Sequence, residues 1–162
     1  MNYKYSTPLT ENSAKAVGIS LPISRKQCYN ICKTLKGMNV QKAKTLLQDV
    51  IEMKKAISYT KYNGDIGHKA GMSAGRYPVK ACKEILMLLK SAEANAQFKG
   101  LSTGSLIVKH ASAQKGPSTY HQGRRRTKAK RTHIEFVLEE QKQEAPKKTT
   151  KKVSKPKTEA TQ

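Results

Sequence analysis

A serine motif is the first candidate for chemistry in this chain. Gly71-Met-Ser73-Ala-Gly75 has the G-x-S-x-G spacing of a nucleophile elbow, which presents a serine for attack on a carbonyl. Such an elbow requires a buried strand before it and a helix directly after it, within a large α/β sheet. Here polar and glycine residues precede the motif, and 162 residues leave little room for such a sheet. We interpret the segment as a flexible loop and keep a small hydrolase using Ser73 as an alternative.

The three cysteines are the second candidate. Cys28 and Cys32 share one face of a predicted helix and Cys82 lies on another helix, so the three could converge. Structural zinc usually takes four ligands from more closely spaced cysteine pairs. All three cysteines occupy apolar positions, where cysteine behaves as a small hydrophobic residue. We expect them to pack in the core of a protein from a reducing compartment, with no metal and no cofactor.

Acid–base catalysis finds little support, because the chain has only 11 Asp and Glu against 32 Lys and Arg. We expect most of these carboxylates at exposed helix or strand positions, so no acid–base pair shares a site and no enzyme is predicted. The net charge of +21 instead suits a phosphate backbone or an anionic membrane. No run approaches the roughly 20 apolar residues of a membrane-spanning helix. We expect no secretory signal, because no positively charged segment is followed by an apolar one as such a signal requires. A nucleic-acid partner is therefore favoured over a membrane.

The strongest feature is a basic segment without compensating acids. Between Glu93 and Glu135 there are nine Lys or Arg and no acidic residue. Six of these cations lie within residues 123–132, between two β-like runs at 105–113 and 133–140. So many like charges at the end of a two-stranded ribbon repel one another unless a polyanion lies against them. An isolated ribbon is marginal in water, so we expect RNA to surround this basic finger. His121 and His133 are interpreted as further RNA contacts or turn residues.

The pattern of apolar residues predicts the elements that position this finger. A short strand is expected at 15–19. The capping-box spacing of Ser24 and Gln27 begins a helix that Gly37 ends, and Asn39 caps a second helix. Pro78 suits the first turn of a third helix, which ends at Gly100. Residues 55–77 read as a basic, glycine-rich loop.

These elements predict an α+β fold, with three helices packed on a small antiparallel sheet and a long protruding β-hairpin at 105–140. Residues 1–140 form one domain in this interpretation. Residues 141–162 are rich in lysine and contain a single apolar Val besides Ala and Pro, so they cannot offset their ordering entropy. We expect a disordered C-terminal tail.

DNA binding is the main alternative function. Two short helices joined by a glycine turn at 24–54 have the arrangement of a DNA-reading motif, and Gln41, Lys42, Lys44 and Gln48 could reach base edges. Any solvated helix would show the same residues, however. The lysine-rich tail also resembles that of a linker histone, which keeps a chromatin-binding protein open as an alternative.

Several stretches point to a known family: Ala14-Lys-Ala-Val-Gly18, Ala43-Lys-Thr-Leu-Leu-Gln-Asp-Val-Ile51, Tyr62-Asn-Gly64, Gly75-Arg-Tyr-Pro-Val-Lys80, Leu88-Leu-Lys-Ser-Ala-Glu-Ala-Asn-Ala96, Lys99-Gly-Leu101, Arg124-Arg-Arg-Thr127 and Thr132-His-Ile-Glu135. Their order, over roughly residues 13–140, resembles the universal large-subunit ribosomal protein twenty-two family, called seventeen in eukaryotic naming. The segment at 88–96 and the basic insertion at 55–77 resemble the archaeal and eukaryotic members.

The resemblance implies a structural role in the large ribosomal subunit, in the cytoplasm, with nucleolar assembly if the source is eukaryotic. It implies large-subunit ribosomal RNA and neighbouring ribosomal proteins as partners, and a hairpin that lines the polypeptide exit tunnel near the nascent chain. On this basis the tunnel tip would comprise Gly123, Arg124, Arg125, Arg126, Thr127 and Lys128. The residues expected to bind ribosomal RNA are Lys15, Arg25, Lys61, Lys69, Arg76, Lys80, Lys109, Lys115, Arg124, Arg125, Arg126, Lys128, Lys130, Arg131 and His133.

Overall fold

The structure, a computed structural model, describes residues 3–124 and 126–141. Its elements follow in the order β1 (Ser13–Leu21), α1 (Arg25–Leu35), α2 (Val40–Ile51), β2 (Ile57–Ser58), β3 (Gly75–Arg76), α3 (Val79–Phe98), β4 (Leu106–Lys115) and β5 (Thr132–Glu140). The tail expected at 141–162 lies outside the described residues except for Gln141.

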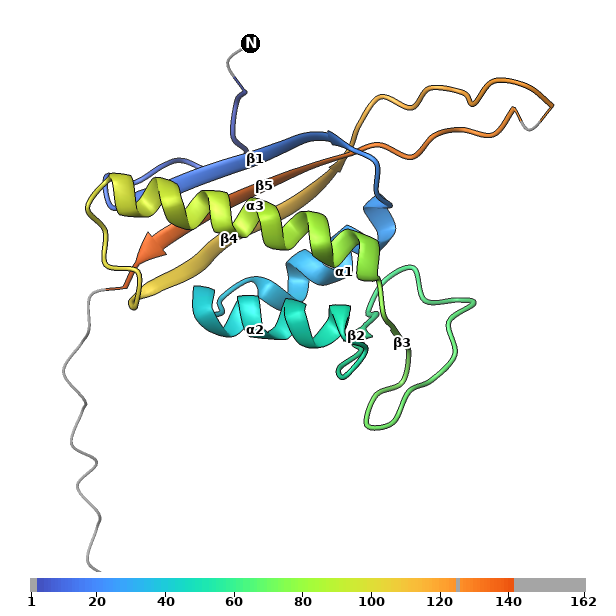
Figure 1. Cartoon of the computed structure of the whole chain (residues 1–162), viewed down its shortest axis with the longest axis horizontal. Coiled ribbons are helices and arrows are strands. Elements are labelled where there is room, and N and C mark those ends of the chain that lie inside the picture. Colours follow the sequence, from blue (N-terminus) through green and yellow to red (C-terminus); the bar gives the residue numbers. More distant parts are fainter. Residues whose placement is uncertain (1–2, 125, 142–162) are drawn as a thin grey trace, which may run out of the picture.

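The three long strands form one antiparallel sheet in the order β1-β5-β4, and the three helices cover one of its faces (Figure 1). This confirms the predicted α+β class. Strand β5 is central, and its Phe136 lies between Ala16 of β1 and Ala111 of β4. Small residues beside a large one leave room for the ring, which is fully buried. Burial of such a side chain stabilises the fold by about 2 to 3 kcal/mol.

The predicted helices are present, and their buried faces match the apolar stripes. In α1 the buried residues include Cys28, Ile31, Cys32 and Leu35. Gly37 has a left-handed backbone (φ 84°), as expected of the residue that ends this helix. Helix α3 begins one residue later than expected, because Pro78 is its N-cap and not part of its first turn.

The two predicted helix caps behave differently. The Asn39 side chain accepts a hydrogen bond of 2.9 Å from the Gln41 amide, and its own amide donates to the Gly104 carbonyl. Ser24 stands at the N-cap of α1, but its side chain makes no capping hydrogen bond. The capping box predicted from Ser24 and Gln27 is therefore wrong, and the first turn of α1 keeps backbone amides without a side-chain cap.

The structure confirms the prediction that the three cysteines pack in the core. Cys28, Cys32 and Cys82 are free and buried. Burial raises the pKa of the Cys28 and Cys82 thiols to about 12, which keeps them protonated at neutral pH. Within the described residues no group of three His, Cys, Asp or Glu could hold a metal ion.

The face of the sheet away from the helices has a cover that the sequence did not indicate. The N-terminal segment, residues 3–12, reaches this face, where Ser6 hydrogen-bonds Glu135 and Thr10 hydrogen-bonds Glu139. Glu135 is only 1% exposed, so the expectation of an exposed strand carboxylate fails at this position. Its neighbours Ile134 and Phe136 alternate to the helix side, which leaves the carboxylate facing the N-terminal segment.

The loop expected at 55–77 contains a short two-stranded ribbon of β2 and β3, in which Ile57 pairs with Arg76 and Ser58 with Gly75. Ser73 is exposed in a bend just before β3. It does not stand between a buried strand and a helix, so the nucleophile elbow and the hydrolase alternative have no structural support.

Candidate nucleic-acid interface

The basic finger extends beyond the sheet as an arm, defined here as residues 116–131 (Figure 1). The regular ladder of β4 and β5 ends where Lys115 pairs with Thr132. Backbone hydrogen bonds continue irregularly into the arm, from the Ala129 amide to the Thr119 carbonyl (2.7 Å) and from the His121 amide to the Thr127 carbonyl (2.8 Å). The arm is thus paired but less regular than the hairpin expected over 105–140.

Cations along the arm face solvent without internal counter-charges. Arg124, Arg126, Lys128 and Lys130 are exposed, and no ion pair found among residues 3–124 and 126–141 involves them. The Lys128 ammonium lies 5.5 Å from the centroid of the Tyr120 ring. Arg125 lies outside the described residues. Gly123, at the expected tip, has a left-handed backbone (φ 81°), a conformation that glycine adopts without strain.

The root of the arm is tied to the chain that leads into α1. Ser20 has a left-handed backbone (φ 56°) where the β1 register shifts, and both of its backbone groups find partners on the arm side. Its carbonyl accepts from Arg131 (3.3 Å), and its amide donates to Nδ1 of His133 (3.1 Å). The Thr132 hydroxyl donates to the Ile23 carbonyl (2.8 Å). These three bonds hold the arm beside the start of α1.

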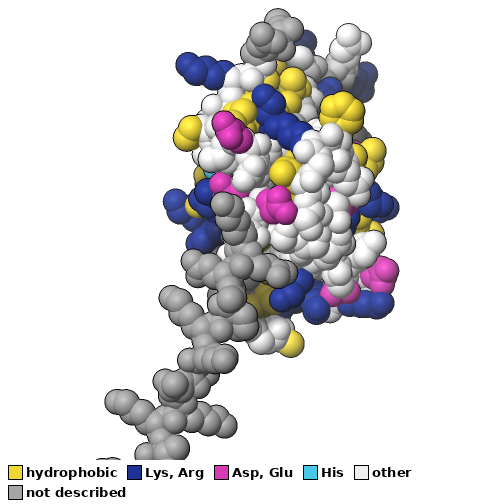
Figure 2. All heavy atoms as spheres, turned by 90° about the vertical axis from the view of Figure 1, so that its left-hand side faces the viewer, with side chains coloured by type: hydrophobic (Ala, Val, Ile, Leu, Met, Phe, Trp, Pro, Cys, Tyr) yellow, Lys and Arg dark blue, Asp and Glu magenta, His cyan; other side chains and the backbone are white. Residues whose placement is uncertain are grey.

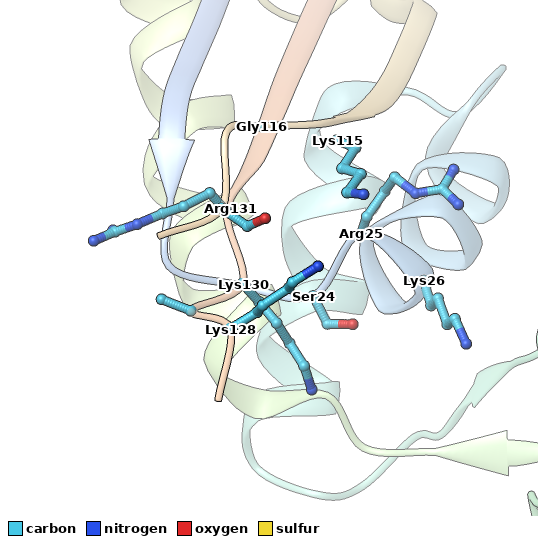
Figure 3. A pocket seen from close by; sticks show the side chains of 10 residues that line it. Ser24, Arg25, Lys26, Lys115, Gly116, Lys128, Lys130 and Arg131 are labelled. Atoms are coloured by element: carbon cyan, nitrogen blue, oxygen red, sulfur yellow. The ribbon is translucent and has the colours of Figure 1, made fainter. Parts of the chain in front are cut away.

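A cationic cleft of about 400 Å³ results between the root of the arm and α1 (Figure 3). Six of its lining residues are cations, namely Arg25, Lys26, Lys115, Lys128, Lys130 and Arg131. Ser24 also lines the cleft, so the uncapped first turn of α1, which holds no acidic residue, faces the same space. Backbone amides and the helix dipole at such a terminus favour an anion. The lining residues and the helix end thus give the cleft a positive charge, although the Arg25 and Arg131 guanidinium groups themselves bond to Tyr62 and to the Ser20 carbonyl.

A second group of predicted residues gathers around two tyrosines next to this cleft. Arg25 and Lys26 approach the Tyr62 ring, at 5.4 and 5.6 Å from its centroid. Lys61 lies 5.5 Å from the centroid of the Tyr29 ring. Arg25 and Lys61 stay predictions as RNA contacts, and the structure places Lys26, Tyr29 and Tyr62 beside them, which the sequence analysis did not single out. Aromatic residues interleaved with basic ones were the available signal.

The other predicted residues lie apart from the cleft. Lys15 lies over Tyr5 (5.1 Å) in a separate cleft at the edge of β1, and Lys80 is exposed at the start of α3. Lys69 lies over Tyr77 (5.7 Å), and Arg76 donates to the Asp65 carbonyl (3.2 Å). Lys109 pairs with Glu139. The Nδ1 atom of His133 accepts the hydrogen bond from the Ser20 amide. These positions stay predictions as RNA contacts.

Acidic side chains lie mostly away from the arm. Figure 2 views the end of the molecule opposite the arm, where Asp and Glu side chains are mixed with Lys and Arg. Ion pairs such as Lys44–Glu93 and Lys55–Asp49 neutralise cations of α2 and the turn after it. Among the described residues, the ion pairs found thus lie outside the arm and the cleft.

The DNA-reading alternative is disfavoured by the packing of α2. Gln41 donates a hydrogen bond of 2.9 Å to Glu93 of α3, and Lys44 pairs with the same carboxylate. Two of the side chains expected to reach base edges are therefore already occupied by α3. In the part of the chain that the structure describes, no helix is long and apolar enough to cross a bilayer.

The cationic cleft and the exposed arm have the charge expected of a surface that binds a polyanion. In a comparison with known protein families, residues 16–139 match the model of the family described as ribosomal protein L22p/L17e. A relative from Archaeoglobus fulgidus, named large ribosomal subunit protein uL22, is 42% identical over 119 residues, which cover 72% of this chain and 77% of the relative.

Other archaeal proteins of the same name are similarly close. The one from Methanocaldococcus jannaschii is 43% identical over 141 residues (80% of this chain and 89% of the relative). That from Methanococcoides burtonii is 44% identical over 115 residues (70% and 76%). The chain belongs to the ribosomal protein L22p/L17e family and is of the archaeal type, which confirms the resemblance found from the sequence.

Proposed function

We propose that this protein is a structural, non-enzymatic constituent of the large ribosomal subunit that binds large-subunit ribosomal RNA through the cationic cleft and the arm. The observation that carries the proposal is a cleft lined by six cationic residues and by Ser24 at the uncapped start of α1. No ion pair seen among the described residues neutralises any of the six. Ribosomal RNA supplies the missing negative charge, and arginine forks bind its phosphates in a bidentate manner.

The finer part of the proposal concerns the arm tip. Residues 123–128 would line the polypeptide exit tunnel and meet the nascent chain, with neighbouring ribosomal proteins as further partners in the cytoplasmic subunit. The resemblance of the Arg124–Thr127 and Thr132–Glu135 stretches to the family supports this placement, together with the projection of the arm from the sheet (Figure 1).

Sucrose-gradient fractionation of cell lysate tests the role directly. Wild-type protein is expected to sediment with large subunits. The double variant Arg124→Glu/Arg126→Glu is expected to be depleted there, because it places two carboxylates where phosphates should bind. Its matched control is Lys83→Glu/Lys90→Glu, which makes the same change of charge at two exposed positions of α3.

Both variants should remain folded by circular dichroism, since neither changes a buried residue. Wild-type protein found only in the soluble fraction would refute the proposed role. Equal depletion of the arm variant and the α3 variant would show that net charge, and not the arm, governs assembly.

A further inference from the structure

Asn30, in the middle of α1, is a buried polar residue with an unusual set of partners. It is 1% exposed, and its Oδ1 accepts from the Thr60 amide (3.1 Å) and the Lys61 amide (3.3 Å). Its Nδ2 donates to the Lys61 carbonyl (3.0 Å) and to the Lys26 carbonyl (2.9 Å). One side chain therefore fastens residues 60–61 onto the first two turns of α1, because leaving its polar atoms unpaired in the interior would be costly.

Tyr62 is the residue that this fastening positions. It follows Lys61 with a left-handed backbone (φ 61°), which is uncommon for an aromatic residue and is retained only where the surroundings impose it. Its ring meets Tyr29 edge to face, with centroids 5.9 Å apart, and its hydroxyl accepts a hydrogen bond of 3.0 Å from Arg25. The ring is thus fixed relative to α1 on two sides.

Despite these contacts the Tyr62 side chain remains on the surface, and the residue is 41% exposed. Arg25 and Lys26, which approach its ring, also line the cationic cleft, so the ring lies beside two of the cations expected to bind phosphate. Among the described residues no ion pair involves these two cations. An exposed, immobilised aromatic ring beside uncompensated cations has the chemistry of a nucleotide site, with the ring for the base and the cations for the backbone.

The geometry selects an unpaired nucleotide over a duplex. In a helix each base is stacked between its neighbours and offers no free face, whereas a bulged or looped base can be splayed out onto an aromatic ring. We infer that Tyr62, held by Asn30 and flanked by Arg25 and Lys26, is a stacking platform for one unpaired base of the RNA whose backbone occupies the cationic cleft. This inference rests on the proposed RNA-binding function and adds the kind of nucleotide that the site takes.

The test uses the full chain and two RNA probes. One is a hairpin with a single bulged 2-aminopurine, and the other is the same hairpin with 2-aminopurine paired to uridine. Wild-type protein should bind the bulged probe more tightly and quench its fluorescence, since stacking on an aromatic ring quenches 2-aminopurine. Tyr62→Leu should weaken binding of the bulged probe by about 5- to 150-fold and abolish the quenching, with little effect on the paired probe. Tyr62→Phe should retain the quenching, because it keeps the ring.

The matched control is Tyr120→Leu, which removes another exposed tyrosine beside a lysine, on the arm. It should leave the preference for the bulge unchanged. Equal weakening of both probes by Tyr62→Leu, or an unchanged preference, would overturn the platform while leaving RNA binding intact. The same loss of preference in Tyr120→Leu would also overturn the assignment to Tyr62. Failure of wild-type protein to bind either probe would instead contradict the proposed function itself.

Discussion

At the scale of single residues, Glu135 is the clearest departure from an otherwise basic molecule. Burial alone would raise the pKa of its carboxyl group, but hydrogen bonds from Ser112 and Ser6 and the nearby His110 hold that pKa below its ordinary value. The Ser112 hydroxyl lies 2.6 Å away, and the Gln114 amide donates to the same oxygen at 2.9 Å. The ionised carboxylate of Glu135, on β5, therefore links the N-terminal segment to β4 by accepting hydrogen bonds from both.

This arrangement makes stability depend on pH in a definite direction. A group whose pKa is lowered by folding stabilises the protein above its unfolded pKa, and that contribution is lost as the pH falls through the folded pKa. Glu135→Gln should lower the free energy of unfolding by about 1 to 2 kcal/mol at neutral pH, because the amide cannot accept the same set of hydrogen bonds. The difference from wild type should shrink as the pH falls below the ordinary pKa of a glutamate side chain.

Urea unfolding at a series of pH values measures this difference. Glu11→Gln is the control, since Glu11 is exposed and should show almost no change at any pH. A deficit in Glu135→Gln that stays constant from neutral to acid pH would contradict the role of the ionised carboxylate.

At the scale of elements, the two helix caps give a paired prediction. Asn39→Ala removes the bond to the Gln41 amide and the link to the Gly104 carbonyl, so it should destabilise the protein by about 1 kcal/mol or slightly more. Ser24→Ala should change stability by only a few tenths of a kcal/mol, because the Ser24 side chain makes no capping bond. Chemical denaturation of the two variants checks both values, and equal losses would show that the caps are equivalent after all.

At the root of the arm, the backbone of Gly116 packs closely against Arg131. This glycine is buried, its amide donates to the Arg131 carbonyl (3.0 Å), and an added Cβ would lie 3.2 Å from the Arg131 carbonyl carbon and 3.1 Å from its Cβ. Gly116→Ala should therefore spread the root and lower stability by about 1 kcal/mol.

The same spreading should weaken RNA binding, because Lys115 and Arg131 line the cleft from the two sides of the root. Gly104→Ala is the comparison, since no atom lies within 4 Å of a Cβ added there. Thermal unfolding measures the loss of stability, and filter binding measures the affinity for RNA. A Gly116→Ala variant that is destabilised but binds RNA with wild-type affinity would show that the root of the arm does not shape the cleft.

At the scale of the whole molecule, the net charge of +21 favours binding to a polyanion, which replaces the small counterions around the protein. If about ten phosphates are neutralised, the logarithm of the RNA association constant should fall against the logarithm of salt concentration with a slope of about −7 to −9. Binding to a large-subunit ribosomal RNA fragment at several salt concentrations measures this slope. Duplex DNA serves as competitor, and equal affinity for both nucleic acids would favour a general DNA-binding protein.

The sequence by itself determined the three helices, the three long strands and the positive charge of the surface, but not the short ribbon of β2 and β3. Apolar residues at helical spacing, Gly37 as a stop and Asn39 as a cap act over a few residues, so local chemistry suffices to place α1 and α2. The absence of acidic residues between Glu93 and Glu135 is likewise evident from the sequence alone. The same local reasoning failed at Ser24, where a capping spacing is present but the bond is not formed.

Only the tertiary structure decided which distant residues meet. The cleft unites residues 24–26 with residues 115–131, and the Glu135 network unites Ser6 with Ser112 and Gln114. The partners of Asn30 come from residues 60–61, and the pattern of residues in α1 alone does not indicate them. Periodicity records which face of an element is buried but not which partner covers it, because that choice depends on the packing of the whole chain.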